Sequence, residues 1–128
     1  PDKEKARSIL QMAESREAFL KSLKNVETYA TIISENYYEI IKELCIAIGF
    51  AEGYKAIGEN AHKESITFVR RYKTFNDEDL EVMQDLRIRR NKSSYEGKPI
   101  EEIYLRNRRK DLLEIIEKLK KTLRERLT

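Results

Sequence analysis

The sequence has few of the residues that break or cross-link a chain. Its 128 residues include four glycines, two prolines, one cysteine and no tryptophan. Because Cys45 is the single cysteine, an internal disulfide is excluded, and we expect a reducing, cytoplasmic location. No apolar run reaches the ~18 residues that a membrane span requires, and no N-terminal signal peptide is evident. We therefore expect no membrane partner.

The sequence also lacks the residue sets of common catalytic and metal centres. It has one histidine, His62, and its one cysteine falls on a different predicted helix, so the spacing of a metal cluster or a nucleophilic triad is missing. No glycine-rich phosphate loop is present. We expect neither a metal nor a cofactor. His62 follows the turn formed by residues 58–60, where a capping or packing histidine is commoner than a general base.

Charged residues, by contrast, make up 38% of the chain. The 26 basic and 23 acidic residues give a formal net charge of +3, which does not by itself indicate a nucleic-acid partner. Many aliphatic and charged residues with little glycine or proline are typical of long amphipathic helices. The length suits one domain. We predict an all-α fold, with residues 1–128 forming a single domain.

Hydrophobic periodicity predicts where the helices lie. Apolar residues recur at helical spacing over about 2–25, 27–50, 59–75 and 77–93, and again along a last helix that follows Pro99. Asn76 is the expected N-cap of the fourth helix, and Pro99 is expected in the first turn of the last one. The second helix is apolar nearly all round from Leu44 to Phe50 and should be the most buried. Short turns between these helices predict an antiparallel up-and-down bundle of four or five helices.

Basic residues gather in three clusters of the C-terminal half. The clusters comprise Arg70, Arg71 and Lys73, then Arg87, Arg89, Arg90 and Lys92, then Arg106, Arg108, Arg109 and Lys110. Such clusters are either solvated helix faces or an electrostatic footprint for RNA or another polyanion, and the sequence leaves both interpretations open. If the second cluster binds a substrate, Arg89 and Lys92 are the candidates to contact it.

Arg90 lies on the apolar stripe of the fourth predicted helix. With Met83 at the centre of the stripe and about 100° per residue, Leu86, Arg87 and Arg90 fall within roughly 60° of it, while Arg89 points away. An inward guanidinium keeps its charge and needs a carboxylate, a phosphate or a wet cleft.

The second predicted helix offers two carboxylates as partners for this guanidinium, Glu39 and Glu43. We favour Glu43, because it lies among apolar residues where an unpaired charge is costly. Such an ion pair can also serve only to fix the register of two helices.

Arg90, Asn91 and Tyr95 form the strongest candidate site. Metal-free RNA cleavage requires a cation that holds the phosphate and a group that orients or deprotonates the ribose 2′-hydroxyl. Arg90 can supply the cation. Tyrosine has a reference pKa of about 10, so Tyr95 fits a positioning role better than that of a base. A tyrosine that only packs at the helix end, with its hydroxyl in water, is the alternative.

Two segments resemble the HEPN domain family of small helical bundles, which are often encoded beside a minimal nucleotidyltransferase. They are YYEIIKELCIAIGFAEGYKAIGENAHKE (37–64), with its paired aromatics, Gly-Tyr-Lys turn and Ala-His opening, and LRIRRNKSSYEG (86–97). The second resembles the family's Arg-Asn-x-x-x-His/Tyr signature. The similar region covers about half of the chain.

This resemblance implies a bundle of four or five helices that pairs as a homodimer and brings two signature arginines to one cleft. Active members are metal-independent endoribonucleases, frequently toxins restrained by the nucleotidyltransferase. Carried over to this sequence, the signature falls on Arg90, Asn91 and Tyr95, with Glu43 and Arg87 in supporting positions. The motif histidine is replaced by Tyr95, which weakens the case for ribonuclease activity, so whether the protein is an enzyme stays open.

An alternative register places Arg87 at the signature arginine and Ser93 at the histidine. Tyr95 then matches the tyrosine that a partner nucleotidylylates in some members.

The residues and the resemblance lead to two hypotheses about function. In the first, the chain is a HEPN-type domain of a toxin–antitoxin or nucleotidyltransferase-linked system that binds or cleaves RNA through a cleft formed by Arg90, Asn91 and Tyr95. In the second, it is a non-catalytic helical partner or substrate-binding subunit of a minimal nucleotidyltransferase.

Overall fold

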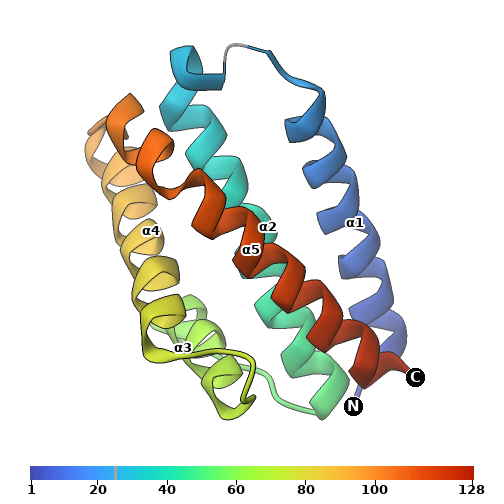
Figure 1. Cartoon of the computed structure of the whole chain (residues 1–128). Helices are drawn as coiled ribbons and strands as arrows, with labels where there is room; N and C mark the ends of the chain where they lie inside the picture. Colours follow the sequence, from blue (N-terminus) through green and yellow to red (C-terminus); the bar gives the residue numbers. More distant parts are fainter. Residues whose placement is uncertain (25) are drawn as a thin grey trace.

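The computed structural model describes residues 1–24 and 26–128, and these residues form α-helices and two short 3₁₀ turns without any strand. The α-helices are α1 (Lys3–Ser22), α2 (Ala30–Glu52), α3 (Ala61–Phe68), α4 (Asp77–Glu96) and α5 (Glu102–Leu127). The long helices α1, α2, α4 and α5 alternate in direction along the chain, and the two termini lie close together (Figure 1). The predicted all-α helical bundle is therefore confirmed.

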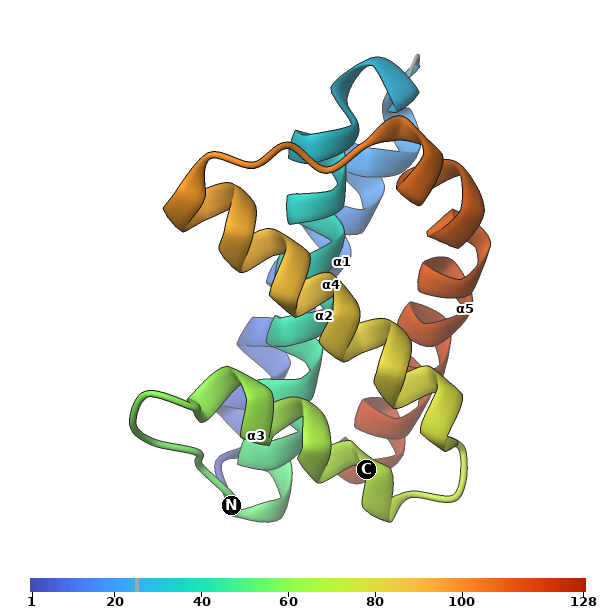
Figure 2. The ribbon, with the colours of Figure 1, turned by 90° about the vertical axis from the view of Figure 1, so that its left-hand side faces the viewer.

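Helix α2 forms the centre of the bundle and packs against α1, α3, α4 and α5. More than half of its residues are buried, and the stretch from Leu44 to Ile48 is almost fully enclosed apart from Ile46. This agrees with the all-round apolar pattern of the sequence. Turning the molecule by 90° shows α3 and α4 together on one side of α2 (Figure 2).

Helix α4 begins where its local sequence predicts, after the Asn76 N-cap. The Asn76 side chain accepts a hydrogen bond from the Asp79 amide at 2.8 Å, and the Asp79 carboxylate accepts one from the Asn76 amide at 3.1 Å, which completes a capping box. The helix continues to Glu96, slightly beyond the predicted end. Gly97 stops it in a left-handed conformation, with a φ of 68° that a glycine adopts without strain.

Two predicted boundaries differ from the structure, and a third is not tested. The predicted end of the first helix, at residue 25, lies outside the described residues. A 3₁₀ turn, η1 (Val26–Tyr29), precedes α2, so α2 begins at Ala30. The third helix ends at Phe68 and continues only as the 3₁₀ turn η2 (Val69–Arg71). Tyr72, which follows the turn, has an extended backbone, and Phe75 is buried in the core.

The sequence predicted Pro99 in the first turn of the last helix, and this prediction is wrong. Pro99 lies in the extended segment before the helix. Helix α5 begins at Glu102. The Ile100 amide donates to the Thr31 hydroxyl oxygen at 2.9 Å, and the Ile100 side chain is buried. These contacts hold the segment against the start of α2, so the helix begins only after this attachment.

Within residues 1–24 and 26–128, no helix combines the length and the apolar character needed to cross a bilayer.

Candidate functional site

The inner face of α4 carries the residues that the helical spacing predicted. Met83 and Leu86 are fully buried, and Arg87 and Arg90 continue the same stripe as partly buried side chains. Arg89 is exposed, as the periodicity indicated. The helix therefore turns two guanidinium groups toward the bundle rather than toward bulk solvent.

Arg90 is held against α2 by loose contacts. Its side chain is 22% exposed, and Nη2 donates to Glu39 Oε1 at 3.5 Å. Nη1 donates to Asn91 Oδ1 at 3.4 Å, and the guanidinium carbon lies 5.4 Å from the centre of the Tyr38 ring. A close bidentate arginine–carboxylate pair has N···O distances of about 2.7–2.9 Å. The Arg90 guanidinium thus retains hydrogen-bonding capacity for an anionic ligand.

The predicted pairing of Glu43 with Arg90 is wrong. Glu43 Oε1 accepts a 2.8 Å hydrogen bond from Arg16 Nε of α1. Glu39, one turn earlier on α2, is the carboxylate that faces Arg90, and it also pairs with Lys42 at 2.8 Å. The two glutamates lie on slightly different faces of α2, and α1 covers one of these faces while α4 approaches the other.

A groove of about 490 Å³ lies between the start of α3 and the second half of α4. Both segments lie on the same side of α2 (Figure 2). The groove is lined by Gly58, Glu59, Asn60, Ala61, His62, Lys63, Arg87, Arg90, Asn91 and Tyr95. The predicted signature residues therefore come together in one place, with two polar side chains of α3 opposite them.

The lining of this groove is positively charged. Lys63, Arg87 and Arg90 contribute cations, and Glu59 contributes the single carboxylate of the lining. Arg87 Nε donates to the neutral Gln84 Oε1 at 2.7 Å, and among residues 1–24 and 26–128 no carboxylate lies within ion-pair distance of Arg87. A concave surface with an excess of one charge concentrates ligands of the opposite charge. The arrangement suits an anion.

His62 is one of the groove residues that the sequence analysis did not place in the site. It is the second residue of α3, which has Asn60 as its N-cap and shows no side-chain capping bond. In the described part of the chain, the His62 ring makes no hydrogen bond. The expected capping role is therefore absent, and the ring lines the groove instead.

The electrostatic surroundings keep the His62 ring neutral. Partial desolvation by the surrounding protein lowers the pKa of the imidazole below its usual 6.5, and the positive charges of Lys42, Arg90 and Arg87 lower it further. The negative charge of Glu39 acts in the opposite direction. The imidazole is accordingly unprotonated at neutral pH and can accept a proton.

Other candidates lie at the edge of the groove or outside it. Tyr95 lines its mouth and is 79% exposed. Ser93, the histidine equivalent of the alternative register, donates to Glu35 Oε2 at 2.7 Å. Arg89 and Lys92 do not belong to the lining. Arg89 instead donates to Asp85 Oδ2 at 2.8 Å and stacks over the Tyr104 ring at 4.5 Å.

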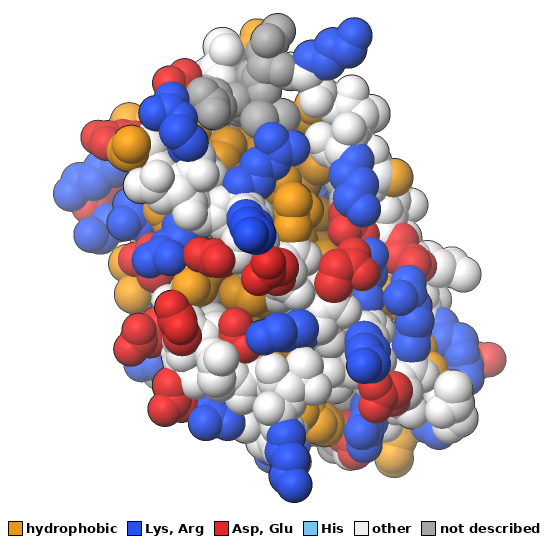
Figure 3. Space-filling view, viewed as in Figure 1, with side chains coloured by type: hydrophobic (Ala, Val, Ile, Leu, Met, Phe, Trp, Pro, Cys, Tyr) orange, Lys and Arg blue, Asp and Glu red, His pale blue; other side chains and the backbone are white. Residues whose placement is uncertain are grey.

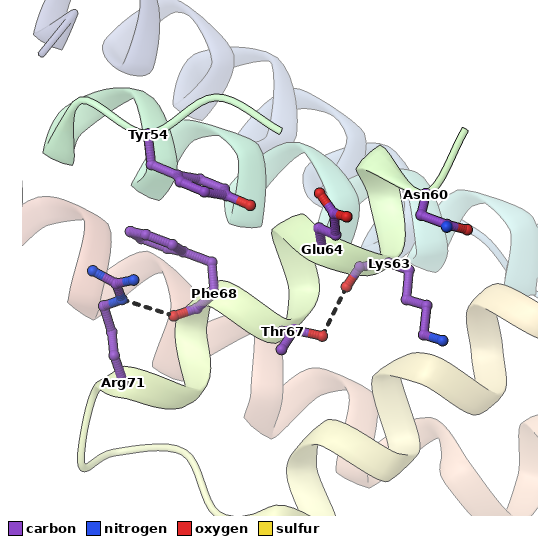
Figure 4. A pocket seen from close by; sticks show the side chains of 7 residues that line it. All are labelled: Tyr54, Asn60, Lys63, Glu64, Thr67, Phe68 and Arg71. Carbon is purple, nitrogen blue, oxygen red and sulfur yellow. Dashed lines mark hydrogen bonds between the residues drawn. The ribbon is translucent and has the colours of Figure 1, made fainter. Parts of the chain in front are cut away.

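A second hollow, of about 450 Å³, lies on another side of α3 and is more apolar. Figure 4 shows the Tyr54 ring lying over the Phe68 ring, with Arg71 beside Phe68. The two rings are stacked with their centres 4.3 Å apart, and the Arg71 guanidinium lies 3.6 Å from the centre of the Phe68 ring. Phe68 is thus covered on both sides and is nearly buried. This aromatic cluster stabilises the fold and offers no free ring face of Phe68 to a ligand.

Each of the other two basic clusters includes at least one arginine that pairs with a neighbouring acid. Arg70 Nε pairs with Asp77 at 2.8 Å, and Arg108 Nη1 pairs with Asp111 at 3.0 Å. Basic and acidic side chains are interspersed over the face formed by α1 and α5 (Figure 3). Solvated, paired helix faces therefore explain these runs, and the groove between α3 and α4 is where cations converge.

No group of three or more His, Cys, Asp or Glu side chains in residues 1–24 and 26–128 is arranged to hold a metal ion. The buried thiol of Cys45 is unpaired with any other cysteine, and burial raises its pKa above the usual range. Comparison with protein-family models, curated proteins and solved structures yields no match.

Proposed function

We propose that the groove between α3 and α4 binds RNA through its phosphates, and that the chain is a HEPN-type domain of a toxin–antitoxin or nucleotidyltransferase-linked system. The observation that carries the proposal is the convergence of Arg87, Arg90, Asn91 and Tyr95 with Lys63 on one cationic groove. The HEPN assignment comes from the sequence signature. The binding chemistry comes from the groove itself.

The groove residues match the parts of a ribonucleotide. Arg87 and Arg90 are one helical turn apart on α4 and present forked donors that fit phosphate oxygens. The Asn91 amide can bond to a sugar hydroxyl. The exposed Tyr95 ring at the mouth can stack on an unpaired base, a common contact in single-strand recognition. A single strand is therefore the expected form of the ligand. As part of the same proposal, the protein is a homodimer.

The proposal predicts weaker RNA binding by the double variant Arg87→Ala/Arg90→Ala. Loss of two phosphate contacts should raise the Kd for a fluorescein-labelled single-stranded RNA by at least about tenfold at low salt. Each lost contact should also reduce the slope of log K against log salt by about 0.7. Fluorescence anisotropy between 25 and 200 mM salt measures both quantities.

The matched control is Lys110→Ala/Lys121→Ala, which removes the same charge from exposed positions of α5 outside the groove. Its Kd and salt slope should stay close to those of the unchanged protein. Equal losses in the two double variants would show that binding depends on overall charge and would refute the groove as the site.

The exposure of Tyr95 favours one further function, the role of a partner that a nucleotidyltransferase modifies. Its hydroxyl is accessible near the end of α4, where a second protein can reach it. In this case Tyr95 oxygen attacks the α-phosphorus of a nucleoside triphosphate in the partner's active site, and pyrophosphate leaves. Protein purified from its own cells should carry a nucleoside monophosphate on Tyr95.

Mass spectrometry of the intact protein and its peptides tests this modification. Tyr95→Phe should lack the adduct, and Tyr29→Phe, at another exposed tyrosine, should retain it. A protein that carries no adduct and retains no nucleotidyltransferase under mild salt would contradict the partner function.

A further inference from the structure

The groove contains a proton acceptor that RNA binding alone does not use. His62 lies among the lining residues together with Arg87, Arg90 and Asn91, yet its ring makes no hydrogen bond in the described part of the chain. Its side chain is exposed to solvent and lines the groove. A single imidazole that faces a cationic phosphate-binding surface is positioned to act on the bound ligand rather than to cap its own helix.

We infer that His62 accepts the proton of a ribose 2′-hydroxyl and that the groove cleaves RNA by internal transesterification. The inference rests on the proposed function, because it needs a phosphate held by Arg87 and Arg90. It assigns the proton-accepting role to a residue of α3, whereas the signature on α4 has Tyr95 in the corresponding position.

The reaction involves the RNA strand, the groove residues and water. The 2′-O–H proton passes to the free nitrogen of the His62 ring, and the 2′-oxygen forms a bond to the adjacent phosphorus. The bond between phosphorus and the 5′-oxygen breaks, and that oxygen takes a proton from water. The products are a 2′,3′-cyclic phosphate and a 5′-hydroxyl end. Arg90 and Arg87 stabilise the negative charge that grows on the phosphate oxygens.

The charges around His62 support this assignment. Lys42 and Glu39 from α2, and Arg90 and Arg87 from α4, are the charged groups that interact electrostatically with the ring. Partial desolvation by the surrounding protein and the neighbouring cations together lower the pKa of the imidazole despite Glu39. Because the ring is neutral at pH 7, most molecules carry the base in its active form.

Further charged residues of both signs lie close to His62 in the sequence and in the groove. Lys63 follows it on α3, and Glu59 lies in the preceding turn and shares the groove. Lys55, from the segment after α2, lines a smaller hollow of about 220 Å³ whose lining also includes His62.

The test measures binding and cleavage separately for His62→Ala and His62→Gln. The substrate is a labelled single-stranded RNA, in EDTA to suppress contaminating metal-dependent nucleases, and an all-deoxy strand of the same sequence serves as the chemical control. The unchanged protein should cleave the RNA to 2′,3′-cyclic phosphate ends and leave the deoxy strand intact. Both His62 variants should bind RNA within about twofold of the unchanged protein and cleave it at least about 100-fold more slowly.

The pH dependence distinguishes a proton acceptor from a structural residue. For a base, the cleavage rate should rise with pH up to the lowered pKa of His62, below 6.5, and then become constant. The residual rate of His62→Gln should lack this rise. Lys121→Ala, purified in parallel, should behave as the unchanged protein does.

The outcomes separate the two proposals. RNA binding that depends on Arg87 and Arg90 without any cleavage overturns the role of His62 and leaves the proposed function intact. Cleavage that persists at full rate in His62→Ala also overturns it. A protein that does not bind RNA at low salt refutes the proposed function, and the inference about His62 with it.

Discussion

Replacing Lys120 by methionine is expected to lower the free energy of unfolding by about 3 kcal/mol, because it leaves a buried carboxylate without its main partner. Lys120 Nζ lies 2.6 Å from Glu17 Oε1, and the two residues are 8% and 5% exposed. Methionine preserves most of the apolar stem and removes only the charge. The expected loss lies at the lower end of the range for buried pairs, since Lys21 still approaches Glu17 at 3.4 Å.

Urea denaturation followed by circular dichroism measures this loss. Lys121→Met is the matched control, because the neighbouring lysine is exposed and its substitution should change stability by no more than about 0.5 kcal/mol. The double variant Glu17→Leu/Lys120→Met removes both charges and should recover most of the loss. A loss below about 1 kcal/mol in Lys120→Met would contradict the importance of the pair.

The pH dependence of this effect has a definite sign. Burial alone would lower the pKa of the Lys120 ammonium, but its hydrogen bonds to Glu17 and Glu117 outweigh burial and raise the pKa above 10.5. A raised pKa means that the stabilisation is complete below the ordinary lysine pKa and declines only as pH rises through the folded-state pKa. The difference between the unchanged protein and Lys120→Met should therefore persist from pH 7 to about pH 10.

The sequence was sufficient to predict the helices and the inward direction of Arg90. Helical periodicity depends only on spacing along one chain segment, so the stripe from Met83 to Arg90 is visible without any tertiary information. The Asn76 capping box is likewise local, because both of its hydrogen bonds join residues three apart. The direction of Arg90 and the Asn76 N-cap, which both depend on a few neighbouring residues, were predicted correctly.

Features that depend on which helices pack against each other were not predicted correctly. Spacing places Glu39 and Glu43 on the core side of α2, but it does not say that α4 approaches Glu39 while Arg16 of α1 takes Glu43. Burial cost alone favoured Glu43, and the cost is met by α1 instead. The packing of helices distant in sequence decided the pairing.

The position of His62 was missed for a related reason. Its place in the groove depends on how the segment between α2 and α3 directs the start of α3 toward the second half of α4. The sequence signal was weak and consisted of the flexible turn before the Ala-His opening. Pro99 shows the same limit, since the tertiary bond from Ile100 to Thr31 delays the helix that proline alone would begin.

The half of α4 that carries the groove residues has no fully buried apolar side chain of its own. Val82, Met83 and Leu86, all in the first half, are the buried residues of this helix. Beyond them the helix is attached to α2 by polar contacts, those of Arg90 with Glu39 and of Ser93 with Glu35. Leu86 is the last apolar anchor before the groove.

Leu86→Ala is therefore expected to lower the free energy of unfolding by about 2–5 kcal/mol, through lost burial and the cavity left behind. Ile88→Ala, on the exposed side of the same helix at 44% exposure, should cost less than about 1 kcal/mol. Urea denaturation measures both values, and hydrogen exchange should show faster exchange of amides 87–96 in Leu86→Ala. A loss in Leu86→Ala no larger than that in Ile88→Ala would contradict this anchoring role.

Measurements of stability and of RNA binding on the same variants separate damage to the fold from damage to the groove. Arg87→Ala/Arg90→Ala should weaken RNA binding with only a small loss of stability, because both side chains are only partly buried and Arg90 has one long ion pair. Leu86→Ala should lose stability but, at a temperature where it stays folded, retain the salt slope of RNA binding, since every cation of the groove remains. A changed salt slope in Leu86→Ala would mean that the groove cations depend on this apolar anchor for their positions.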